Sequence, residues 1–547
     1  MSRSRALSLL RRGLATSLFA AKKGMTPSDA AAELNAIRVS RREALALAAA
    51  AAVPFACGDD PVEPPANTRY GADVRVAVVG AGAAGLMCGY RLTNYGFKPK
   101  VFDAATRVGG RMFTTNSGLS DGQVAELGGE LVDTNHILLR ALVDELGLTL
   151  DDLFANEPAG YRRDTFWFGG RLVPESEIVE KFSPLAAKMQ AELSAAETDE
   201  AKFATLDDMG MKAWLDAQTD VDPLIKDIIA VAYLDEYGLE IDQQSVFNLL
   251  YLIDFETADP FRVYGDSDER FHIHGGNEQV PKALAAALSS GVELEQRLVR
   301  VKSLASGTVE LTFDKGGTAK SEEFDRAILA LPFTLLRDVE FQFELPADQR
   351  QAIDELGYGT NAKLMAQFTS RVWHDTHNAS GSTITDNGLQ ELWDTARGQP
   401  GTSGLLTNFV GGQEGVAMGE KTPEEQVSDR LARIDAIFPG AAAAYRPNTA
   451  LRMHWPSAPF AKGSYACYKP GQWAFAGVEG KQVGALHFAG EHTSIDFQGY
   501  MEGAIETGQR AADEIQRDLA DPGSALRAAP RSRGSLRKLR RKARRAH

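Results

Sequence analysis

The chain has 547 residues, 44% of them hydrophobic, so it can bury a large core and form two or more domains. Residues 43–526 carry 40 Lys or Arg and 72 Asp or Glu, a net charge of −32, and this acidic body argues against a nucleic-acid partner. Three cysteines without a C-x-x-C pair exclude a disulfide framework and argue against a zinc site, so we expect no metal. No apolar run reaches the ~18 residues needed to span a bilayer.

The first 57 residues are typical of an export signal. Arg41-Arg42 precede an uncharged run, 44–56, which resembles a bacterial twin-arginine signal. Cys57 follows this run and resembles a lipoprotein acylation site, although the Pro-Phe before Ala56 fits that pattern poorly. We therefore expect an exported protein, periplasmic or held on the outer side of the cytoplasmic membrane by a lipid at Cys57. A soluble exported protein and a cytoplasmic protein stay open, and the polar stretch 58–70 is interpreted as a linker.

A dinucleotide-binding pattern follows. A β-rich run, 74–79, leads into the glycine motif Gly80-Ala81-Gly82-Ala83-Ala84-Gly85 and a helical pattern over 86–95, and a second strand, 99–102, ends at Asp103. The three glycines permit a tight turn, a close approach of backbone to a pyrophosphate, and packing of helix on strand. Asp103 is placed to accept a hydrogen bond from a ribose hydroxyl. The pattern predicts a Rossmann-like domain.

A second glycine-rich cluster indicates a flavin enzyme more than an NAD enzyme. It consists of Arg107-Val108-Gly109-Gly110-Arg111 and, further on, Glu126-Leu127-Gly128-Gly129-Glu130. Paired glycines beside basic residues let backbone and arginine side chains approach phosphates.

The remaining chain alternates helix and strand signals. Residues 136–270 are predicted to be largely helical. His272 and His274 alternate along a predicted strand, but with no third ligand nearby a metal pair is disfavoured. Predicted helices span 138–148, 183–196, 224–237, 279–288 and 501–515, and predicted strands span 294–301, 327–331, 364–368 and 485–489.

The ordered motifs resemble the flavin-containing amine oxidase family, which includes monoamine oxidases, polyamine oxidases and L-amino acid oxidases, in its bacterial exported form. The resemblance covers about residues 72–520 and implies an α/β fold: an FAD-binding Rossmann-like domain with a mixed α+β substrate domain inserted in pieces. It assigns 71–135, 270–355 and 450–520 to the FAD-binding domain and 136–269 and 356–449 to the substrate domain. The basic tail, 521–547, is predicted to be disordered. The motifs include Gly275-Gly276, Ala330-Leu331-Pro332, Lys363, Trp455, 463–468 and 490–503.

The resemblance also assigns cofactor-binding residues. Glu491 would hold the ribityl–pyrophosphate side, and the helix start at Gly499–Met501 would direct its dipole at the flavin. Leu298 would contact the adenine through its backbone. The full set is Gly80, Gly82, Ala83, Ala84, Gly85, Asp103, Ala104, Arg107, Gly109, Gly110, Arg111, Leu127, Gly128, Gly129, Glu130, Leu298, Trp455, Gly490, Glu491, Gly499, Tyr500 and Met501.

Four residues are assigned to catalysis by the same resemblance. Lys363 matches a lysine that holds a water against flavin N5, and Tyr465 and Tyr500 match two tyrosines that face each other across the substrate amine. Trp455 completes the set. Ser464 stands where covalent members of the family have the cysteine that bonds the flavin, so FAD is expected to bind non-covalently.

The implied reaction oxidises a primary amine or an L-amino acid at the α-carbon, with transfer to flavin N5, hydrolysis of the imine and reduction of O2 to H2O2. An L-amino acid substrate needs a cation for its carboxylate, and Arg140, Arg262 and Arg270 are candidates. The family's amino acid oxidases often have a tryptophan at the position of Tyr500, so the tyrosine favours a simple amine over an L-amino acid. A dehydrogenase that uses another electron acceptor and a non-catalytic FAD-binding protein are the alternatives, and a homodimer is left open.

Overall fold

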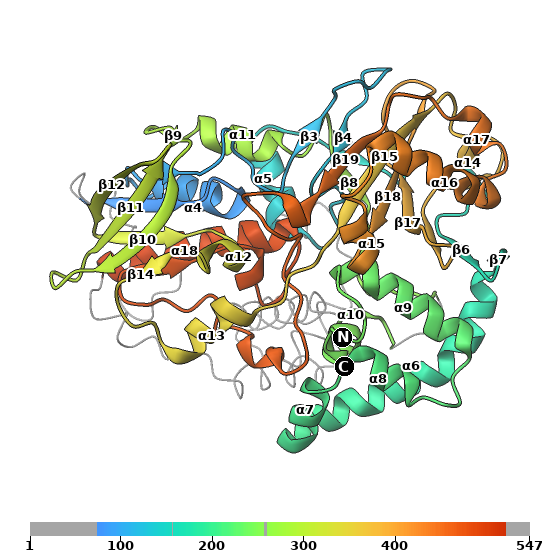
Figure 1. Cartoon of the computed structure of the whole chain (residues 1–547), viewed down its shortest axis with the longest axis horizontal. Coiled ribbons are helices and arrows are strands. Elements are labelled where there is room, and N and C mark those ends of the chain that lie inside the picture. Colours follow the sequence, from blue (N-terminus) through green and yellow to red (C-terminus); the bar gives the residue numbers. More distant parts are fainter. Residues whose placement is uncertain (1–73, 156, 256–259, 521–547) are drawn as a thin grey trace, which may run out of the picture. The chain divides into compact units, whose positions relative to one another are not determined.

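The computed structural model describes residues 74–155, 157–255 and 260–520, which belong to one compact unit (Figure 1). The predicted export signal, linker and basic tail lie outside the described residues. Within the described ranges, every helix is too short or too polar to cross a membrane.

A five-stranded parallel sheet carries the glycine motif. Its order is β20-β13-β1-β2-β9, with β1 at the centre. Every residue of β1 is buried, as expected for a parallel strand that is covered on both faces. The strands are β1 (Val76–Val79), β2 (Lys100–Phe102), β9 (Val292–Glu293), β13 (Arg326–Leu329) and β20 (Leu486–Phe488). This sheet confirms the predicted α/β fold with a Rossmann-like core.

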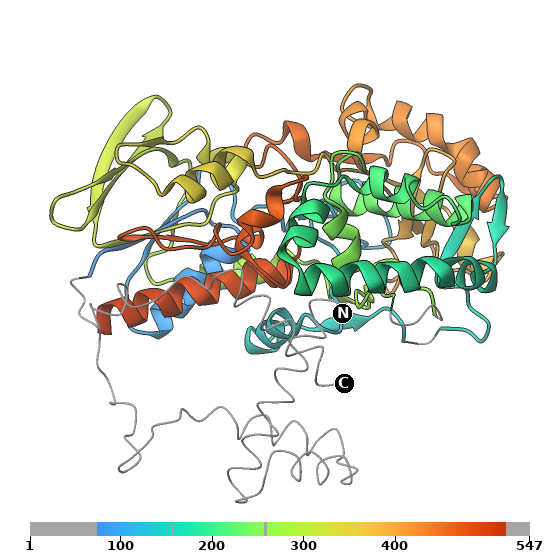
Figure 2. The ribbon, with the colours of Figure 1, turned by 90° about the horizontal axis from the view of Figure 1, so that it is seen from below.

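Two helices from opposite ends of the chain pack together against this sheet. Helix α4 (Ala83–Asn94) and helix α18 (Met501–Ala520) lie side by side, coloured blue and red in Figure 2. Helix α4 begins three residues before the predicted start at 86, because Gly82 is already its N-cap and the last three residues of the glycine motif are helical. Helices α5 (Ile137–Glu145) and α11 (Gln279–Ala286) pack against α18 and α4, respectively.

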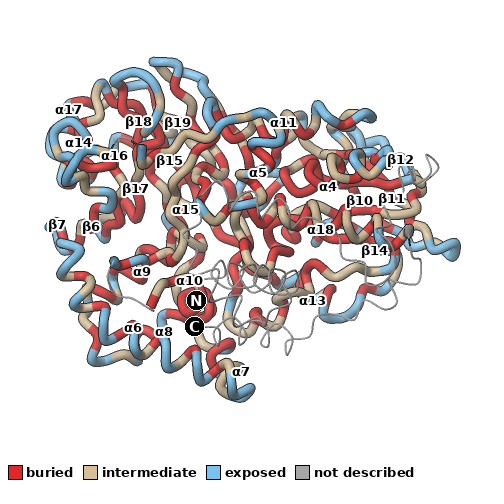
Figure 3. The backbone as a smooth tube through the Cα atoms, turned by 180° about the vertical axis from the view of Figure 1, so that it is seen from behind, coloured by how far each residue is buried: buried red, intermediate tan, exposed pale blue. Residues whose placement is uncertain are grey.

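The second large sheet is mixed and has seven strands, in the order β19-β15-β18-β17-β16-β6-β7. Strand β15 is buried along its whole length, and the buried runs of β15, β17 and β18 are visible in Figure 3. Helix α9 (Pro223–Tyr237) packs on β16, β17 and β18, and helix α16 (Pro423–Ile437) packs on β15. The strands are β6 (Thr165–Phe168), β7 (Arg171–Val173), β15 (Ala362–Phe368), β16 (Thr383–Thr385), β17 (Gln390–Asp394), β18 (Gly404–Val410) and β19 (Leu451–His454).

Residues 136–270 are less uniformly helical than predicted. They contain the helices α6 (Glu175–Thr198), α7 (Glu200–Asp207), α8 (Met211–Asp216) and α10 (Val246–Leu252), but also strands β5 (Leu150–Asp152), β6 and β7. Helix α6 starts eight residues before the predicted start at 183 and continues through Pro184, with Glu175 and Glu177 in its first turn. The piecewise division into cofactor and substrate domains stays a prediction.

The smaller sheets complete the fold. A four-stranded sheet has the order β12-β11-β10-β14, and the pairs β3-β4 and β5-β8 are two-stranded. Their strands are β3 (Thr114–Thr115), β4 (Ala125–Glu126), β8 (Phe271–Ile273), β10 (Arg297–Ser303), β11 (Val309–Lys315), β12 (Thr318–Phe324) and β14 (Glu340–Phe341). The short helices are α12 (Phe333–Leu336), α13 (Ala347–Glu355), α14 (Val372–Asp375), α15 (Gly412–Ala417), α17 (Ala441–Ala444), η1 (Trp455–Ser457), η2 (Gln472–Phe475) and η3 (Glu491–Thr493).

Candidate functional site

The glycine motif forms an open turn between β1 and α4. Gly80 has a φ of +106°, and a Cβ on it would lie 2.5 Å from the Ala330 carbonyl oxygen. A Cβ on Gly85 would lie 1.8 Å from the Gly80 oxygen, whereas a Cβ on Gly82 would meet nothing within 4 Å. The N-cap Gly82 offers no side-chain hydrogen bond to the first turn of α4. The backbone N–H groups of the first turn of α4 and the open space at Gly82 fit a pyrophosphate.

Asp103 closes this turn from the end of β2. Its Oδ2 accepts the Ala81 amide at 2.6 Å, and its Oδ1 accepts the Ala105 amide at 2.8 Å. Burial raises the pKa of Asp103 despite these two bonds. The neighbouring Ala104 is half-buried, and Leu298 is buried in β10.

The second glycine cluster lies directly against the first. The Gly109 amide donates to the Ala81 carbonyl at 2.8 Å, and a Cβ on Gly110 would lie 3.3 Å from the Gly82 Cα. The Arg107 guanidinium donates to the Val108 and Gly110 carbonyls. The two glycine clusters predicted from sequence therefore form one surface.

Arg111 ties this surface to the end of the chain. Its Nη1 donates to the Ser464 carbonyl at 2.6 Å and to Glu491 Oε1 at 2.8 Å. The other oxygen of Glu491 accepts the amide of Gly499 at 2.9 Å, in the turn that starts α18. Gly499 has a φ of +93°, the left-handed region that glycine adopts without strain.

The Gly128-Gly129 segment packs into the same junction. A Cβ on Gly128 would lie 1.8 Å from the Arg111 oxygen, and a Cβ on Gly129 would lie 2.9 Å from Met501 Cγ. Residues from 107 to 130 and from 464 to 501 thus meet, as the sequence motifs predict for one cofactor site. The preceding residue, Leu127, is half-buried and donates its amide to the Phe113 carbonyl.

Lys363 is buried in β15 and holds an ion pair. Its Nζ donates to Glu130 Oε2 and to the Gly128 carbonyl, both at 2.8 Å, and to the Glu126 carbonyl at 3.1 Å. It also lies 5.1 Å from the centroid of the Trp393 ring. Burial acts to raise the pKa of Glu130, but the Lys363 charge and the hydrogen bonds to the carboxylate outweigh it and hold the pKa below its usual value. Its assigned role, holding a water against the flavin, stays a prediction.

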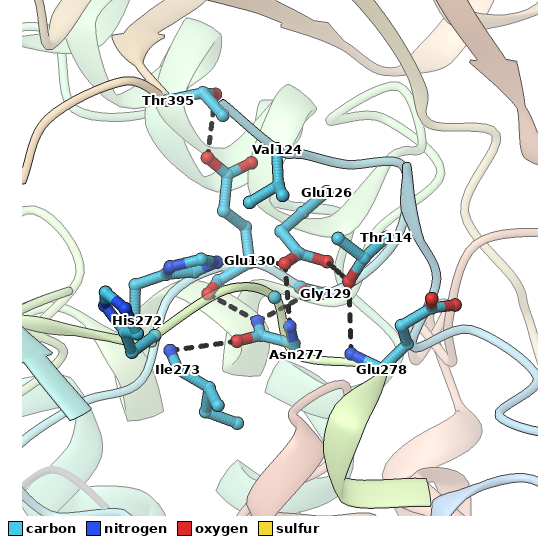
Figure 4. A network of polar contacts seen from close by, with 12 residues as sticks. Thr114, Val124, Glu126, Gly129, Glu130, His272, Ile273, Asn277, Glu278 and Thr395 are labelled. Atoms are coloured by element: carbon cyan, nitrogen blue, oxygen red, sulfur yellow. Dashed lines mark hydrogen bonds and ion pairs between the residues drawn. The ribbon is translucent and has the colours of Figure 1, made fainter. Parts of the chain in front are cut away.

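A second buried carboxylate, Glu126, supports the Glu130 segment (Figure 4). Its oxygens accept from Thr114 Oγ1 at 2.8 Å and from the Asn277 amide at 2.8 Å, and lie 2.9 Å from His272 Nε2. Burial lowers the pKa of His272, but Glu126, together with Glu130 and Asp151, raises it, and the net shift is upward. His274 is exposed and pairs instead with Asp151. The two histidines therefore have separate partners, and residues 74–520 as described contain no cluster of three metal-ligating side chains.

Tyr465 and Tyr500 meet at a residue that the sequence reasoning missed. Tyr465 Oη donates to the Glu236 carbonyl at 2.6 Å, and Tyr500 Oη donates to Glu236 Oε1 at 3.1 Å. A Cβ on Gly499 would lie 3.6 Å from the Tyr465 ring, which places the two tyrosine-bearing segments side by side. Trp455 is buried at the start of η1, and its carbonyl accepts the Gly463 amide, which fixes the approach to Ser464.

Glu236 belongs to a group of uncompensated acids. Burial raises the pKa of Glu236 to about 8, with Asp133 adding to the shift, and raises the pKa of Asp133 to about 7. Asp235 and Glu391 are buried, and burial raises their pKa values well above the ordinary range. Glu236 and Glu269 add to the shift of both, and Asp235 adds to that of Glu391. Asp235 Oδ2 has no hydrogen-bond partner in the described part of the chain. The available sequence signal was an Asp-Glu pair directly after the uncharged run 228–234 of helix α9.

The three arginines proposed for a carboxylate have other contacts. Arg140 donates to the Thr134 carbonyl, and Arg270 forms a bidentate pair with Asp152. Arg262 is about half exposed and lies 3.8 Å from Asp254.

Known proteins resemble this chain in sequence and in fold. The family described as "Flavin containing amine oxidoreductase" matches residues 83–516. A Mycobacterium tuberculosis protein named as a flavin-containing monoamine oxidase, AofH, is 26% identical over 465 residues, which cover 81% of this chain and 96% of that protein. An L-amino acid dehydrogenase of Synechocystis is 25% identical over 80% of this chain and 94% of that protein. The structure of cyclohexylamine oxidase from Brevibacterium oxydans superposes with a TM-score of 0.71 at 24% identity, covering 82% of this chain and all of that one.

Proposed function

Because the chain belongs to the flavin-containing amine oxidoreductases, we propose that it is an FAD-dependent oxidase of primary amines. The amine is oxidised at its α-carbon to an imine, which water hydrolyses to an aldehyde and ammonia, and O2 is reduced to H2O2. Of the two substrate classes in the family, the proposal selects simple amines over L-amino acids.

The residues around the glycine motif fit FAD. Gly82 and the first turn of α4 would hold the pyrophosphate, Asp103 a ribose hydroxyl, and the Arg111–Glu491 junction the flavin end. Bound FAD supplies the two-electron acceptor, while the protein supplies orientation and electrostatics. Tyr465 and Tyr500 would orient the amine between aromatic faces and exclude water.

Non-covalent attachment is part of the proposal. Ser464 Oγ donates to Asn361 Oδ1 at 2.5 Å, and a hydroxyl does not replace thiolate chemistry. Acid precipitation should release the flavin into the supernatant. A yellow pellet would contradict non-covalent binding.

The choice of a simple amine rests on one observation, the acidic surroundings of the two tyrosines. Glu236 contacts both tyrosines, and the charged group that raises its pKa besides burial is another acid, Asp133. An L-amino acid would bring a carboxylate that needs a cation to pair with, and the groups that shift the pKa of Glu236 include no cation. An amine without a carboxylate needs no such partner.

An H2O2-coupled screen of primary amines, polyamines and L-amino acids tests the proposal. We expect turnover with amines that lack a carboxylate, at least tenfold above any L-amino acid. A preference for L-amino acids would overturn the substrate class but not the oxidase reaction.

A dehydrogenase is the second candidate, favoured by the similarity to the Synechocystis L-amino acid dehydrogenase. Stopped-flow mixing of the reduced protein with air-saturated buffer separates the two. Fast return of oxidised flavin supports an oxidase, and its absence supports a dehydrogenase that uses another acceptor.

Export through the twin-arginine route remains part of the proposal, on the strength of Arg41-Arg42 alone. The double variant Arg41→Lys, Arg42→Lys should retain the protein in the cytoplasm. Export of that variant at the normal level would show that the signal was misread.

A further inference from the structure

Glu236 holds both tyrosines from the last turn of α9. Its carbonyl accepts Tyr465 Oη and its carboxyl accepts Tyr500 Oη. Gly238 ends the helix in the left-handed conformation, and Asn361 Nδ2 anchors the turn by donating to the Asp235 carbonyl at 2.6 Å. The position of the Glu236 carboxyl is therefore fixed by the backbone on one side and by Tyr500 on the other.

The charged and titratable groups around this carboxyl are mainly acids and phenols. They are Asp133, Tyr233, Asp235, Tyr237, Tyr264, Glu269, Glu391, Tyr465 and Tyr500. His136 stacks edge-on against the Tyr500 ring, but burial lowers its pKa to about 3, so it is neutral. Arg397 faces Glu269 and Asp164. In these surroundings, burial raises the pKa of Glu236 to about 8.

An amine substrate must lose a proton before it is oxidised, and a carboxylate such as Glu236 can accept that proton. An alkyl ammonium has a pKa of ~10.4, so nearly all of the substrate is protonated at neutral pH. Oxidation at the α-carbon needs the nitrogen lone pair, and the ammonium must first lose a proton.

We propose that Glu236, acting through the hydroxyl of Tyr500, receives the proton that the substrate ammonium loses on binding between the two tyrosines. This inference rests on the proposed amine oxidase function and adds a positioning residue to it. The N–H bond of the ammonium breaks as its proton passes to Tyr500 Oη, while the Tyr500 proton passes to Glu236 Oε1. Tyr500 ends as a phenol, Glu236 as a carboxylic acid and the substrate as a neutral amine.

This step balances in charge, since one cation and one carboxylate become two neutral groups. Burial raises the pKa of the Tyr500 phenol, so the hydroxyl passes a proton without ionising. The acid returns its proton to water before the next turnover.

The pH dependence of kcat/KM tests the inference. For the wild type we expect a bell, rising through about 8 as Glu236 ionises and falling near the pKa of the substrate. Glu236→Gln should lose the lower limb and rise only toward ~10.4 with the neutral amine. Its kcat/KM should be about 100-fold lower at pH 8, where about 0.4% of the amine is neutral and about half of the wild-type Glu236 is ionised. An unchanged bell in Glu236→Gln would overturn the inference.

Two further variants separate proton transfer from structure. Tyr500→Phe keeps the aromatic wall but removes the relay hydroxyl, so it should show the same profile as Glu236→Gln. Glu269→Gln is the matched control. Burial raises the pKa of Glu269 to about 8 as well, but the hydrogen bond described for Glu269 runs from its backbone amide to Asp133. Glu269→Gln should keep the wild-type bell, and loss of the lower limb in this control would assign the titration to Glu269.

Proton counting gives a readout without turnover. The holoenzyme is titrated with tert-butylamine, whose α-carbon carries no hydrogen, by calorimetry in buffers of different ionisation enthalpy. Proton release by the wild type should fall from about one to about zero as the pH rises through 8, whereas Glu236→Gln should release about one proton up to pH 9. Identical curves for the two proteins would contradict the inference. Failure of every variant and of the wild type to oxidise any amine at any pH would instead contradict the proposed function.

Discussion

Two groups of carboxylates near the candidate site differ in the charge of their neighbours. On the cofactor side, Glu130 pairs with Lys363 and Glu491 pairs with Arg111. On the substrate side, Asp235, Glu236 and Glu391 are surrounded by other acids, and their pKa values are raised. The acids of the first group are paired with cations, whereas no cation is among the groups that shift the pKa values of the second.

The difference in neighbours has different consequences for stability in the two groups. A paired buried carboxylate becomes strongly destabilising when its partner is removed, because a lone charge remains in a low dielectric. An unpaired buried acid avoids that cost by holding its proton. The first group therefore depends on its cations for stability, and the second holds its protons to higher pH.

The largest effect is expected from Lys363→Met. The variant leaves Glu130 buried without its cation, and breaking a buried pair costs about 3–5 kcal/mol of the free energy of unfolding. Chemical denaturation measures this loss, and rapid mixing should also show slowed flavin reduction or reoxidation.

The double variant Lys363→Met, Glu130→Gln is the control. Removing the orphaned charge should recover most of the lost stability but not the flavin kinetics. A double variant as unstable as the single one would mean that Glu130 is not held by Lys363.

Tyr500→Ala should reduce turnover more than FAD binding. It removes one aromatic wall and the bond to Glu236, and misplacement of a substrate by about 1 Å costs roughly 100-fold in rate. The measurement compares kcat with the Kd for FAD obtained by titrating the apoprotein. A tenfold weaker FAD affinity with normal kcat would place Tyr500 on the cofactor side.

Arg111→Gln should weaken FAD binding by about 10–100-fold, because hydrogen bonds to charged groups contribute about 1.5–3 kcal/mol. Fluorescence titration of the apoprotein with FAD measures the change. Arg140→Gln is the matched control, since Arg140 donates only to the Thr134 carbonyl among the hydrogen bonds described for it. Equal losses in the two variants would indicate a general charge effect.

The last prediction concerns the effect of Glu269→Gln on stability. The folded pKa of Glu269 is about 8, above the ~4.3 of an unfolded glutamate, so its contribution to stability is complete below ~4.3 and is lost as pH rises toward 8. The variant should therefore gain stability relative to the wild type at pH 9 compared with pH 4. Thermal unfolding at the two pH values measures the difference, and a larger gain at pH 4 would give the opposite sign.

Local patterns made the cofactor side predictable. The glycine motif, Asp103 and Arg111 lie in short segments whose spacing follows from the chemistry of the turn, and the structure brings these segments together. The start of α4 was misplaced by three residues because the helical conformation begins inside the glycine motif.

Long-range contacts on both sides of the site were hard to predict. Glu236 meets Tyr500 across 264 residues, and Lys363 meets Glu130 across 233, and neither distance has a signature in a single sequence. The three candidate arginines could be named from their residue type alone, but only the fold shows that each has another partner. The strands within 136–270 were missed because runs of three or four residues are too short for a period to register.

The position of β20 in the parallel sheet has a consequence for biosynthesis. This strand joins β13 at the edge of the sheet, and α18 then covers α4, so the last described segments of the chain complete a layer that its first described segments begin. A nascent chain emerging from the ribosome must keep β1 and α4 incompletely covered until Leu486–Ala520 has been translated. Premature termination anywhere before Leu486 should therefore yield an aggregation-prone product rather than a smaller working protein.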